Sequence, residues 1–253
     1  MQMLVTMGRG GTGKTSFVAL MAKYFIQKGE TPLLLIDADP DQNLAEMVGV
    51  DLEEERVRTI ADLTTETFIE RGGTTAGVAP TERIENRIWE EGLYEGTSFD
   101  LLAVGTKWIE GCYCLPDAAL KGALGTITKS YRYVLIDSPA GLEHLNRKIT
   151  TKVDAIFDLV SPSSRTFEHV RRAHRIIQEV QIENAHFFLI GSFMFPESEE
   201  ERLKAELPYD YLGKIPFDPT LQEYLLKGRS LLDVPKDLPV YRAVEEILSR
   251  AGY

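Results

Sequence analysis

The sequence predicts an α/β protein with a three-layer, doubly wound and mostly parallel sheet. Three observations lead to this prediction. Short apolar stretches alternate with helical stretches along the chain, which is typical of a parallel sheet covered by helices. A glycine-rich loop joins the first predicted strand to the first predicted helix. The length of 253 residues suits one large α/β domain.

The predicted strands are apolar runs that suit burial on both faces of a parallel sheet. Most of them end in Gly, Asp or Ser-Pro, and they cover residues 3–7, 32–37, 99–104, 133–137, 155–160 and 186–193. Helices are predicted over residues 15–28, 116–130, 143–152, 165–180, 198–206 and 238–250. The stretch from about 51 to 96 is charged, rich in Thr and Gly and poorly periodic. We expect it to be a helical and loop insertion within a single domain spanning 1–253.

The composition argues against several classes of protein. The net charge of −11 disfavours broad DNA binding, which needs a basic face. No apolar run approaches the roughly 20 residues that span a bilayer. The opening residues, MQMLVTMGRGG, lack the basic region and cleavage site of a signal peptide. We therefore expect a cytoplasmic protein that binds neither nucleic acid nor a membrane.

The glycine-rich loop matches the phosphate-binding pattern GxxxxGK[ST] from Gly8 to Thr15, so that the predicted fold class is that of a P-loop nucleoside triphosphatase. Its glycines let backbone N–H groups surround phosphate oxygens, and the N-terminus of the following helix adds a positive end. Lys14 is expected to reach the β- and γ-phosphates, Thr15 to hold Mg²⁺, and Ser16 to donate the next hydrogen bond. The alternative is a glycine-rich turn that happens to precede a helix. The predicted phosphate-binding residues are Gly8, Arg9, Gly10, Gly11, Thr12, Gly13, Lys14, Thr15 and Ser16.

Three aspartates follow predicted strands. Asp37 and Asp39 end the stretch LLLIDADP, and Asp137 ends YVLID. A carboxylate at the C-terminal end of a strand can orient an attacking water or hold a metal ion through water. We expect Asp39 to act in catalysis together with Lys14 and Arg9. Asp37 and Asp137 are expected to help bind the nucleotide and its cofactor, with Asp137 near Mg²⁺. For any single aspartate, a turn or a helix cap is the alternative.

The two cysteines of the chain, Cys112 and Cys114, lie two positions apart in EGCYCLPD. In a reducing compartment, such a pair is more typical of metal binding or redox chemistry than of a structural disulfide. Two unrelated buried thiols are the remaining alternative.

The motifs RGGTGKT, DADP and DSPAG together resemble the deviant-Walker-A ATPases, which include the MinD septum-site proteins, the ParA partition proteins and the nitrogenase iron protein. Within that group, GCYCLPDAALKGAL and DSPAGLEHLNR look most like the CooC-type carbon monoxide dehydrogenase maturation factors. The resemblance implies a Mg·ATP-dependent homodimer that couples ATP hydrolysis to nickel delivery into a client enzyme such as carbon monoxide dehydrogenase. It also implies that Cys112 and Cys114 of both subunits meet at the dimer axis and bind Ni²⁺ or Zn²⁺.

Metal chemistry is consistent with such a shared site. One CxC pair offers two thiolates, whereas a soft divalent ion takes about four ligands. A symmetric dimer supplies both cysteines twice. A tetrahedral set of four sulfurs suits Zn²⁺ and a square-planar set suits Ni²⁺, so the ligands leave the choice of metal open.

The sequence departs from the family pattern at two places. Family members usually carry lysine at the position of Arg9, a residue that reaches across the dimer to the partner's phosphates. Arginine keeps the charge and can contact phosphate in a bidentate manner, and we expect slow hydrolysis. Relatives also carry an Asn-Lys or Asn-Arg pair that reads adenine, where this chain has Gly191 and Ser192. Residues near the base are expected from the segment GKIPFDPTL: Pro216, Phe217 and Asp218.

A second function remains open from the same motifs. A ParA- or MinD-like switch ATPase would position DNA or septum proteins. It would bind DNA or lipid in an ATP-dependent manner and be indifferent to the loss of Cys112 and Cys114.

Overall fold

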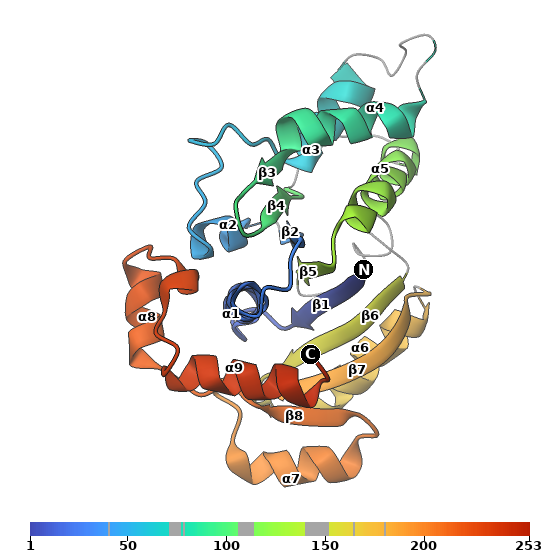
Figure 1. Ribbon diagram of the computed structural model, residues 1–253. Helices are drawn as coiled ribbons and strands as arrows, with labels where there is room; N and C mark the ends of the chain where they lie inside the picture. Colours follow the sequence, from blue (N-terminus) through green and yellow to red (C-terminus); the bar gives the residue numbers. More distant parts are fainter. Residues whose placement is uncertain are drawn as a thin grey trace.

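The computed structural model describes residues 1–39, 41–70, 77, 79–105, 114–139, 152–163, 165–179 and 181–253. These residues contain an eight-stranded sheet of order β3-β4-β2-β5-β1-β6-β7-β8 (Figure 1). Every neighbouring pair is parallel except β3 and β4, which are antiparallel. The predicted doubly wound, mostly parallel α/β fold is therefore confirmed.

Six strands lie where the apolar runs predict them. They are β1 (Gln2–Gly8), β2 (Leu33–Asp37), β4 (Asp100–Ala103), β5 (Tyr133–Asp137), β6 (Lys152–Val160) and β7 (Glu183–Gly191). All five residues of β2 are buried, as expected for a strand covered on both faces. The sequence did not predict β3 (Leu93–Glu95) and β8 (Asp210–Lys214). Both form edges of the sheet, where a strand has no need of a continuous apolar run.

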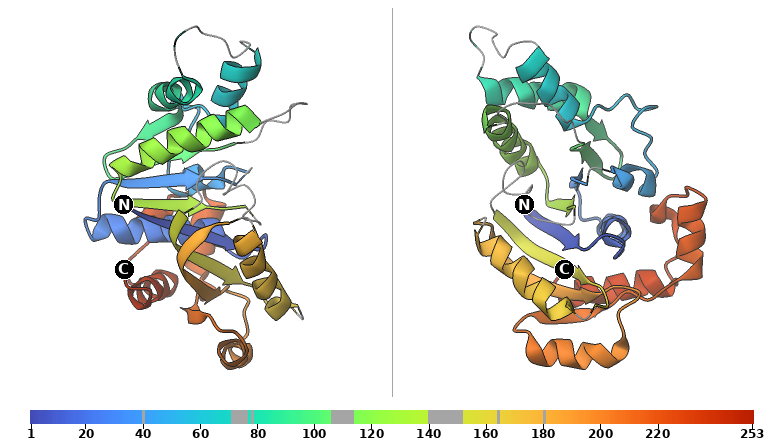
Figure 2. Two further views of the ribbon diagram at one scale, coloured as in Figure 1. Left: turned by 90° about the vertical axis from the view of Figure 1, so that its right-hand side faces the viewer. Right: turned by 180° about the vertical axis from the view of Figure 1, so that it is seen from behind.

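Helices cover both faces of the sheet (Figures 1 and 2). One face carries α1 (Lys14–Gln27), α2 (Asn43–Met47), α8 (Pro219–Leu226) and α9 (Pro239–Arg250). The other carries α3 (Ile60–Thr65), α4 (Pro80–Arg87), α5 (Cys114–Ile127), α6 (Thr166–Glu179) and α7 (Glu197–Glu206). The sequence missed α2 and α8, which are short. The helix predicted at 143–152 lies outside the described residues, apart from Lys152, which begins β6.

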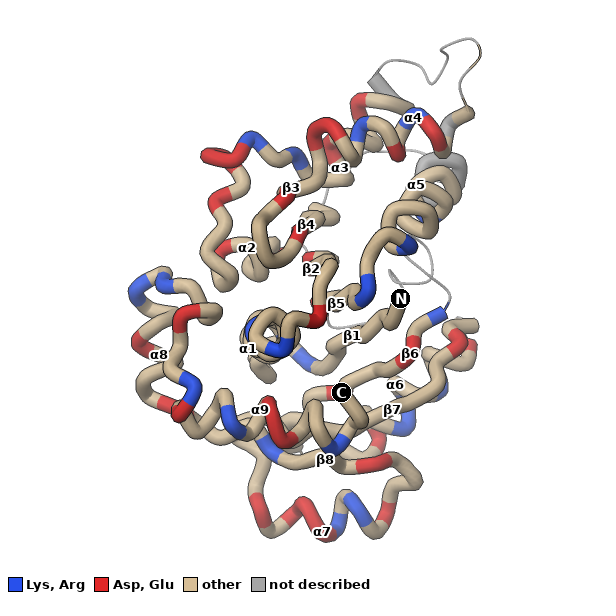
Figure 3. Tube along the Cα trace, in the orientation of Figure 1, with Lys and Arg blue, Asp and Glu red and all other residues tan. Residues whose placement is uncertain are grey.

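The amphipathic helix α9 turns its apolar face into the core. Its buried residues belong to the same hydrophobic cluster as those of α1: Val240, Tyr241, Val244, Ile247 and Leu248. That face is consequently not available to bind a lipid surface in this fold. In the described part of the chain, no helix is long and apolar enough to cross a membrane. Figure 3 shows both charge signs along the outer helix α7.

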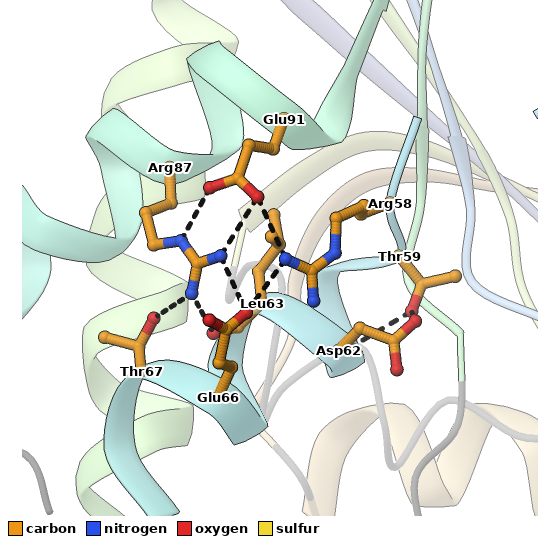
Figure 4. Close-up of polar contacts among 8 residues, drawn as sticks. All are labelled: Arg58, Thr59, Asp62, Leu63, Glu66, Thr67, Arg87 and Glu91. Atoms are coloured by element: carbon orange, nitrogen blue, oxygen red, sulfur yellow. Dashed lines mark hydrogen bonds and ion pairs between the residues drawn. The ribbon is translucent and has the colours of Figure 1, made fainter. Parts of the chain in front are cut away.

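Helices α3 and α4 lie beside the β3 edge and are joined by an ion-pair network (Figure 4). Arg87 Nη2 lies 2.9 Å from Glu66 Oε2, and Arg87 Nε lies 2.9 Å from Glu91 Oε1. Arg58 Nη1 contacts the same two carboxylates at 2.8 and 2.9 Å. Arg87 also donates a hydrogen bond to Thr67 Oγ1 at 3.0 Å. The network links α3, α4 and the π-helical turns η1 (Glu66–Glu70) and η2 (Ile88–Gly92).

Replacing Arg87 with methionine should lower the free energy of unfolding by about 2 kcal/mol, because the carboxylates of Glu66 and Glu91, 18% and 35% exposed, lose one of their two guanidinium partners and keep Arg58. Urea unfolding of the wild-type and variant chains measures this difference. The matched control is Arg202→Met on α7, whose ion pairs with Glu199 and Glu206 are exposed. The control should unfold close to wild type. Equal stability of Arg87→Met and wild type would show that the network is not stabilising.

Candidate functional site

The C-terminal ends of three adjacent strands bring the predicted nucleotide residues together. Strands β2, β5 and β1 are neighbours in the sheet, and the register pairs Asp37 with Asp137 and Asp137 with Thr6. The glycine-rich loop leaves β1 two residues after Thr6 and enters α1 at Lys14. Both aspartates and the loop therefore lie beside one another at the C-terminal ends of these central strands, which is the usual place for ligands in an open α/β fold.

Two glycines make the path of the loop possible. Gly8 has φ 142°, and a Cβ atom there would lie 2.6 Å from the carbonyl oxygen of Leu159 on β6. Gly13 is the N-cap of α1 with φ 90°, and no side chain caps the helix. The first N–H groups of α1 are thus left for an external acceptor. Cβ atoms built at Gly10, Gly11 and Gly13 would meet nothing within 4 Å, so the space beside the loop is open.

The side chains of the loop fold back onto its backbone. The Thr12 hydroxyl donates a hydrogen bond to the carbonyl oxygen of Arg9 at 2.8 Å, and Lys14 Nζ donates to the same oxygen at 3.3 Å. Thr12 and Lys14 are buried, whereas Arg9 is exposed. Ser16, in the first turn of α1, donates a weak hydrogen bond to Met47 Sδ at 3.8 Å. The Lys14 ammonium therefore lies over the loop, and the Arg9 side chain points outward.

Asp137 is a fully buried carboxylate whose two oxygens make no hydrogen bond of good geometry with the described residues. Burial raises its pKa to about 6. The neighbouring Thr15 hydroxyl and Lys14 ammonium act in the opposite direction and lower this pKa. A carboxylate and a hydroxyl are the oxygen donors that Mg²⁺ prefers. Thr15 and Asp137 therefore fit a hydrated Mg²⁺ ion.

Asp37 differs from Asp137 in having backbone partners. Its Oδ2 accepts from the Leu44 N–H at 2.9 Å, and its Oδ1 accepts from the Asp39 N–H at 3.2 Å. Burial and the neighbouring Asp137 raise its pKa to about 7. Asp37 thus fixes the turn that carries Asp39. The half-buried Asp39 accepts a hydrogen bond from the Asp41 N–H at 3.1 Å.

An apolar pocket of about 350 Å³ adjoins the loop on the α1 face. The predicted base-site residues Pro216, Phe217 and Asp218 line it together with Gly11, Thr12, Gly13 and Ser16. The Asp218 carboxylate caps α8, because its Oδ1 accepts from the N–H groups of Thr220 and Leu221 at 2.9 and 3.3 Å. The sequence missed the other main lining residues: Phe17, Leu20, Phe193, Ile215, Leu221, Gln222, Leu225 and Val240.

A family model described as an AAA domain matches residues 2–189, which is most of the chain. The chain belongs to the AAA domain family. An uncharacterized ATP-binding protein of Methanocaldococcus jannaschii is 34% identical over 247 residues, covering 96% of this chain and 95% of the relative. The strand–loop–helix arrangement at Gly8 to Thr15 is thus part of a family fold.

Two further likenesses to known proteins bear on function and on fold. The carbon monoxide dehydrogenase accessory protein CooC of Rhodospirillum rubrum is 29% identical over 243 residues, covering 92% of this chain and 90% of that protein. The solved MinD cell division protein of Aquifex aeolicus superposes with a TM-score of 0.69 at 22% identity, covering 100% of this chain and 97% of that one. This second likeness shows that the fold is that of the MinD and ParA ATPases.

The predicted metal ligands lie in a segment that the structure describes only in part. Cys112 lies outside the described residues, and Cys114 is the first residue of α5, with its side chain outside them as well. Residues 141–151, which include the GLEHLNR segment, also lie outside. Among the described residues, no group of three or more His, Cys, Asp or Glu side chains could hold a metal ion. The CxC site therefore stays a prediction.

A second cavity, of about 370 Å³, lies between the loop and α6, and no sequence motif predicts it. Asp158 of β6 lines it and is 6% exposed, beside Met7 in the sheet register. Burial alone raises the pKa of Asp158 to about 7. Arg9, His169 and Arg172 line the same cavity without pairing with Asp158. A single aspartate in an apolar strand carries no sequence signal of its own.

Replacing Asp158 with asparagine should make stability less dependent on pH. In the unfolded chain Asp158 ionises near pH 4, but in the folded protein only near pH 7. The folded state therefore loses stability as the pH rises between these values. The difference in free energy of unfolding between Asp158→Asn and wild type should therefore shift in favour of the variant by about 2–4 kcal/mol from pH 4 to pH 8. Urea unfolding at both values tests this, with the exposed Asp237→Asn as control. A pH-independent difference would contradict it.

Proposed function

We propose that this chain binds Mg·ATP at the glycine-rich loop and hydrolyses it. The observation that carries the proposal is the meeting of an uncapped helix N-terminus, an open glycine-rich loop and the unpartnered Asp137 carboxylate. Backbone N–H groups of the loop and of α1 would bind the β-phosphate, and Lys14 would move from the Arg9 carbonyl oxygen onto the β- and γ-phosphates. Thr15 and Asp137 would hold Mg²⁺, which neutralises phosphate charge when bound.

Asp39 is the residue that we propose to orient the attacking water. It lies on the turn after β2, one strand from Asp137, and its Oδ1 accepts only a backbone N–H in the described structure. Water adds to the γ-phosphorus, the bond to the ADP oxygen breaks, and ADP and phosphate leave. The exposed Arg9 side chain would reach the nucleotide of a partner subunit in a homodimer.

Hydrolysis is proposed to be slow because Arg9 replaces the family lysine. A planar guanidinium needs more room than an ammonium at the same phosphate. The variant Arg9→Lys should therefore release phosphate at least about tenfold faster than wild type at saturating ATP, because a better-placed cation stabilises the transition state. The measurement is phosphate release at a fixed protein concentration. A rate equal to or below wild type would contradict this role for Arg9.

We further propose that the chain is a dimeric metallochaperone whose cargo is Ni²⁺ or Zn²⁺ bound by Cys112 and Cys114 from both subunits. Two features support this proposal: the CxC pair holds both cysteines of the chain, and the CooC accessory protein of Rhodospirillum rubrum is similar over 92% of the chain. As its name states, that relative is an accessory protein of carbon monoxide dehydrogenase. A nickel enzyme of that kind is the proposed client.

Reconstitution of a client tests the proposed function. Nickel-free carbon monoxide dehydrogenase is incubated anaerobically with the nickel-loaded chain, with and without Mg·ATP, and carbon monoxide oxidation is followed. Activity should return faster with Mg·ATP than without it, and faster than with the same concentration of free nickel. Equal recovery from free nickel would overturn the chaperone role. ATP-dependent binding to DNA or lipid vesicles, with no effect on reconstitution, would instead favour a positioning switch.

A further inference from the structure

Asp158 occupies a place in the sheet that apolar side chains normally fill. Ile156 and Val160, two positions away on either side along β6, belong to the hydrophobic cluster that also contains buried residues of α6. In the sheet register, Asp158 lies between Met7 of β1 and Leu189 of β7, which belong to the same cluster. A carboxylate in such surroundings lowers stability unless it has a partner. Its position therefore indicates a role other than packing.

The Asp158 carboxylate has no partner in the described part of the chain. It is 6% exposed and lines the cavity between the loop and α6. Burial raises its pKa to about 7, and neither a charged neighbour nor a hydrogen-bond donor offsets this effect. At pH 8 the folded protein thus holds a largely ionised carboxylate without a counter-charge. A ligand with a positive group that donates hydrogen bonds would supply the missing partner.

Cationic side chains of α6 border the same cavity. His169 and Arg172 are three residues apart in this helix and therefore lie on one face of it. Both line the cavity together with the apolar side chains of Val170, Ala173 and Ile176. Arg172 is exposed, and among the described residues neither cationic side chain has an ion-pair partner. A guanidinium with free N–H groups beside an imidazole favours a carboxylate group of a ligand.

The cavity thus joins a buried carboxylate to cationic side chains nearer the surface. We propose that it binds a small zwitterion of the α-amino acid class, whose ammonium contacts Asp158 and whose carboxylate contacts Arg172 and His169. A bare amine would be repelled by the cations of α6, and a bare carboxylate would be repelled by Asp158. A zwitterion gains both contacts, and the apolar wall of the cavity suits an aliphatic side chain such as that of leucine.

The dimensions of the cavity suit such a ligand. Its volume of about 370 Å³ falls within the range of about 300–1,000 Å³ that is typical of small-molecule sites. Asp158 forms no ion pair with Arg172 or His169, so a gap separates the opposite charges. Two charge-assisted hydrogen bonds of about 2.8 Å each, with the ligand between them, can bridge this gap. None of these three side chains is assigned to the nucleotide, so the site goes beyond the proposed function.

Calorimetric titration of the full chain at pH 8 with L-leucine, 3-methylbutylamine and 4-methylpentanoate tests the proposal. The amine lacks the carboxylate of leucine, and the acid lacks its ammonium. Leucine should bind with a Kd below about 1 mM, and each of the other two compounds should bind at least about tenfold more weakly. Absence of leucine binding overturns the proposal. Binding of the amine or of the acid as tight as that of leucine also overturns it.

The variant Asp158→Asn keeps the size of the side chain and removes its charge. Its affinity for leucine should fall at least about 30-fold, because the ligand ammonium would lie buried without a counter-charge. Leucine bound equally well by this variant and by wild type overturns the proposed site. Circular dichroism checks that the variant is folded. Phosphate release from ATP is measured in parallel, so that failure of this proposal is distinguished from failure of the proposed ATPase.

The variant Arg172→Met tests the other end of the ligand. Affinity for leucine should fall about fivefold, a smaller loss than at Asp158, because water screens the exposed guanidinium. Arg175→Met is the matched control, because Arg175 is exposed on the same helix and does not line the cavity. It should bind leucine like wild type. Equal losses of affinity in the two arginine variants would show a general charge effect and overturn the assignment of Arg172.

Discussion

Replacing Lys14 with methionine should lower ATP hydrolysis at saturating ATP by at least about 100-fold, the usual cost of losing one charge-stabilising donor in a transition state. Lys14 is buried in the first turn of α1, and its Nζ lies 3.3 Å from the Arg9 carbonyl oxygen. No other ammonium in the described structure lies in this loop. Methionine keeps the length and apolar stem of the side chain, so the fold should persist.

The control for this variant lies on the same helix. Lys28 is the exposed C-cap of α1, at the end far from the loop. Lys28→Met should hydrolyse ATP like wild type, and both variants should give wild-type circular dichroism. Phosphate release by Lys14→Met at more than about a tenth of the wild-type rate would contradict the proposed site, because Lys14 would then not contact the reacting phosphate.

Replacing both cysteines with serine should abolish metal binding. Thiolate sites for Zn²⁺ contribute about 10–16 kcal/mol of binding free energy, and serine hydroxyls are poor ligands for soft metals. We expect the affinity of Cys112→Ser/Cys114→Ser for Zn²⁺ and Ni²⁺ to fall by at least about 1,000-fold. Competition with a chromophoric chelator under anaerobic conditions measures this change.

The residue between the two cysteines offers a matched control. Tyr113→Phe leaves both thiols in place and should bind metal like wild type. Each single serine variant should also lose most of its affinity, because a shared site would lose one ligand from each subunit. Metal bound equally well by the double serine variant would show that the CxC pair is not the site. Retained ATP hydrolysis in that variant would confirm that its fold is intact.

The strands and helices that the sequence revealed are those with a strong local pattern. Strand β2, LLLID, is an uninterrupted apolar run because helices cover it on both faces. Strand β8, DYLGK, escaped prediction because it is an edge strand with charged ends and a glycine at φ 138°. The prediction of one domain with an insertion over about 51–96 stays a prediction, although helices α3 and α4 fall within that range.

The residues of the candidate site likewise differ in whether a local sequence pattern predicts them. The residues Gly8 to Thr15 match a motif with fixed spacing, and Asp37 and Asp137 each end an apolar run of strand length. Their positions along the chain therefore already suggest that they meet at the C-terminal ends of the strands. Phe193 and Asp158 carry no such motif. Phe193 meets Phe217 only because β7 and β8 pair in register, and Asp158 faces a cavity only because α6 crosses over β6. Tertiary contacts between distant segments create both features, and local sequence cannot reveal them.

We propose that Cys112 and Cys114 form half of a metal site shared by two subunits of an ATP-dependent dimer. Anaerobic nickel titration combined with size-exclusion chromatography, with and without Mg·ATP, tests this shared site. We expect about one nickel per two chains, a shift from monomer to dimer, and thiolate charge-transfer absorption. Dimer formation with Mg·ATP alone and no bound nickel would rule out the shared site and favour a switch ATPase without metal cargo.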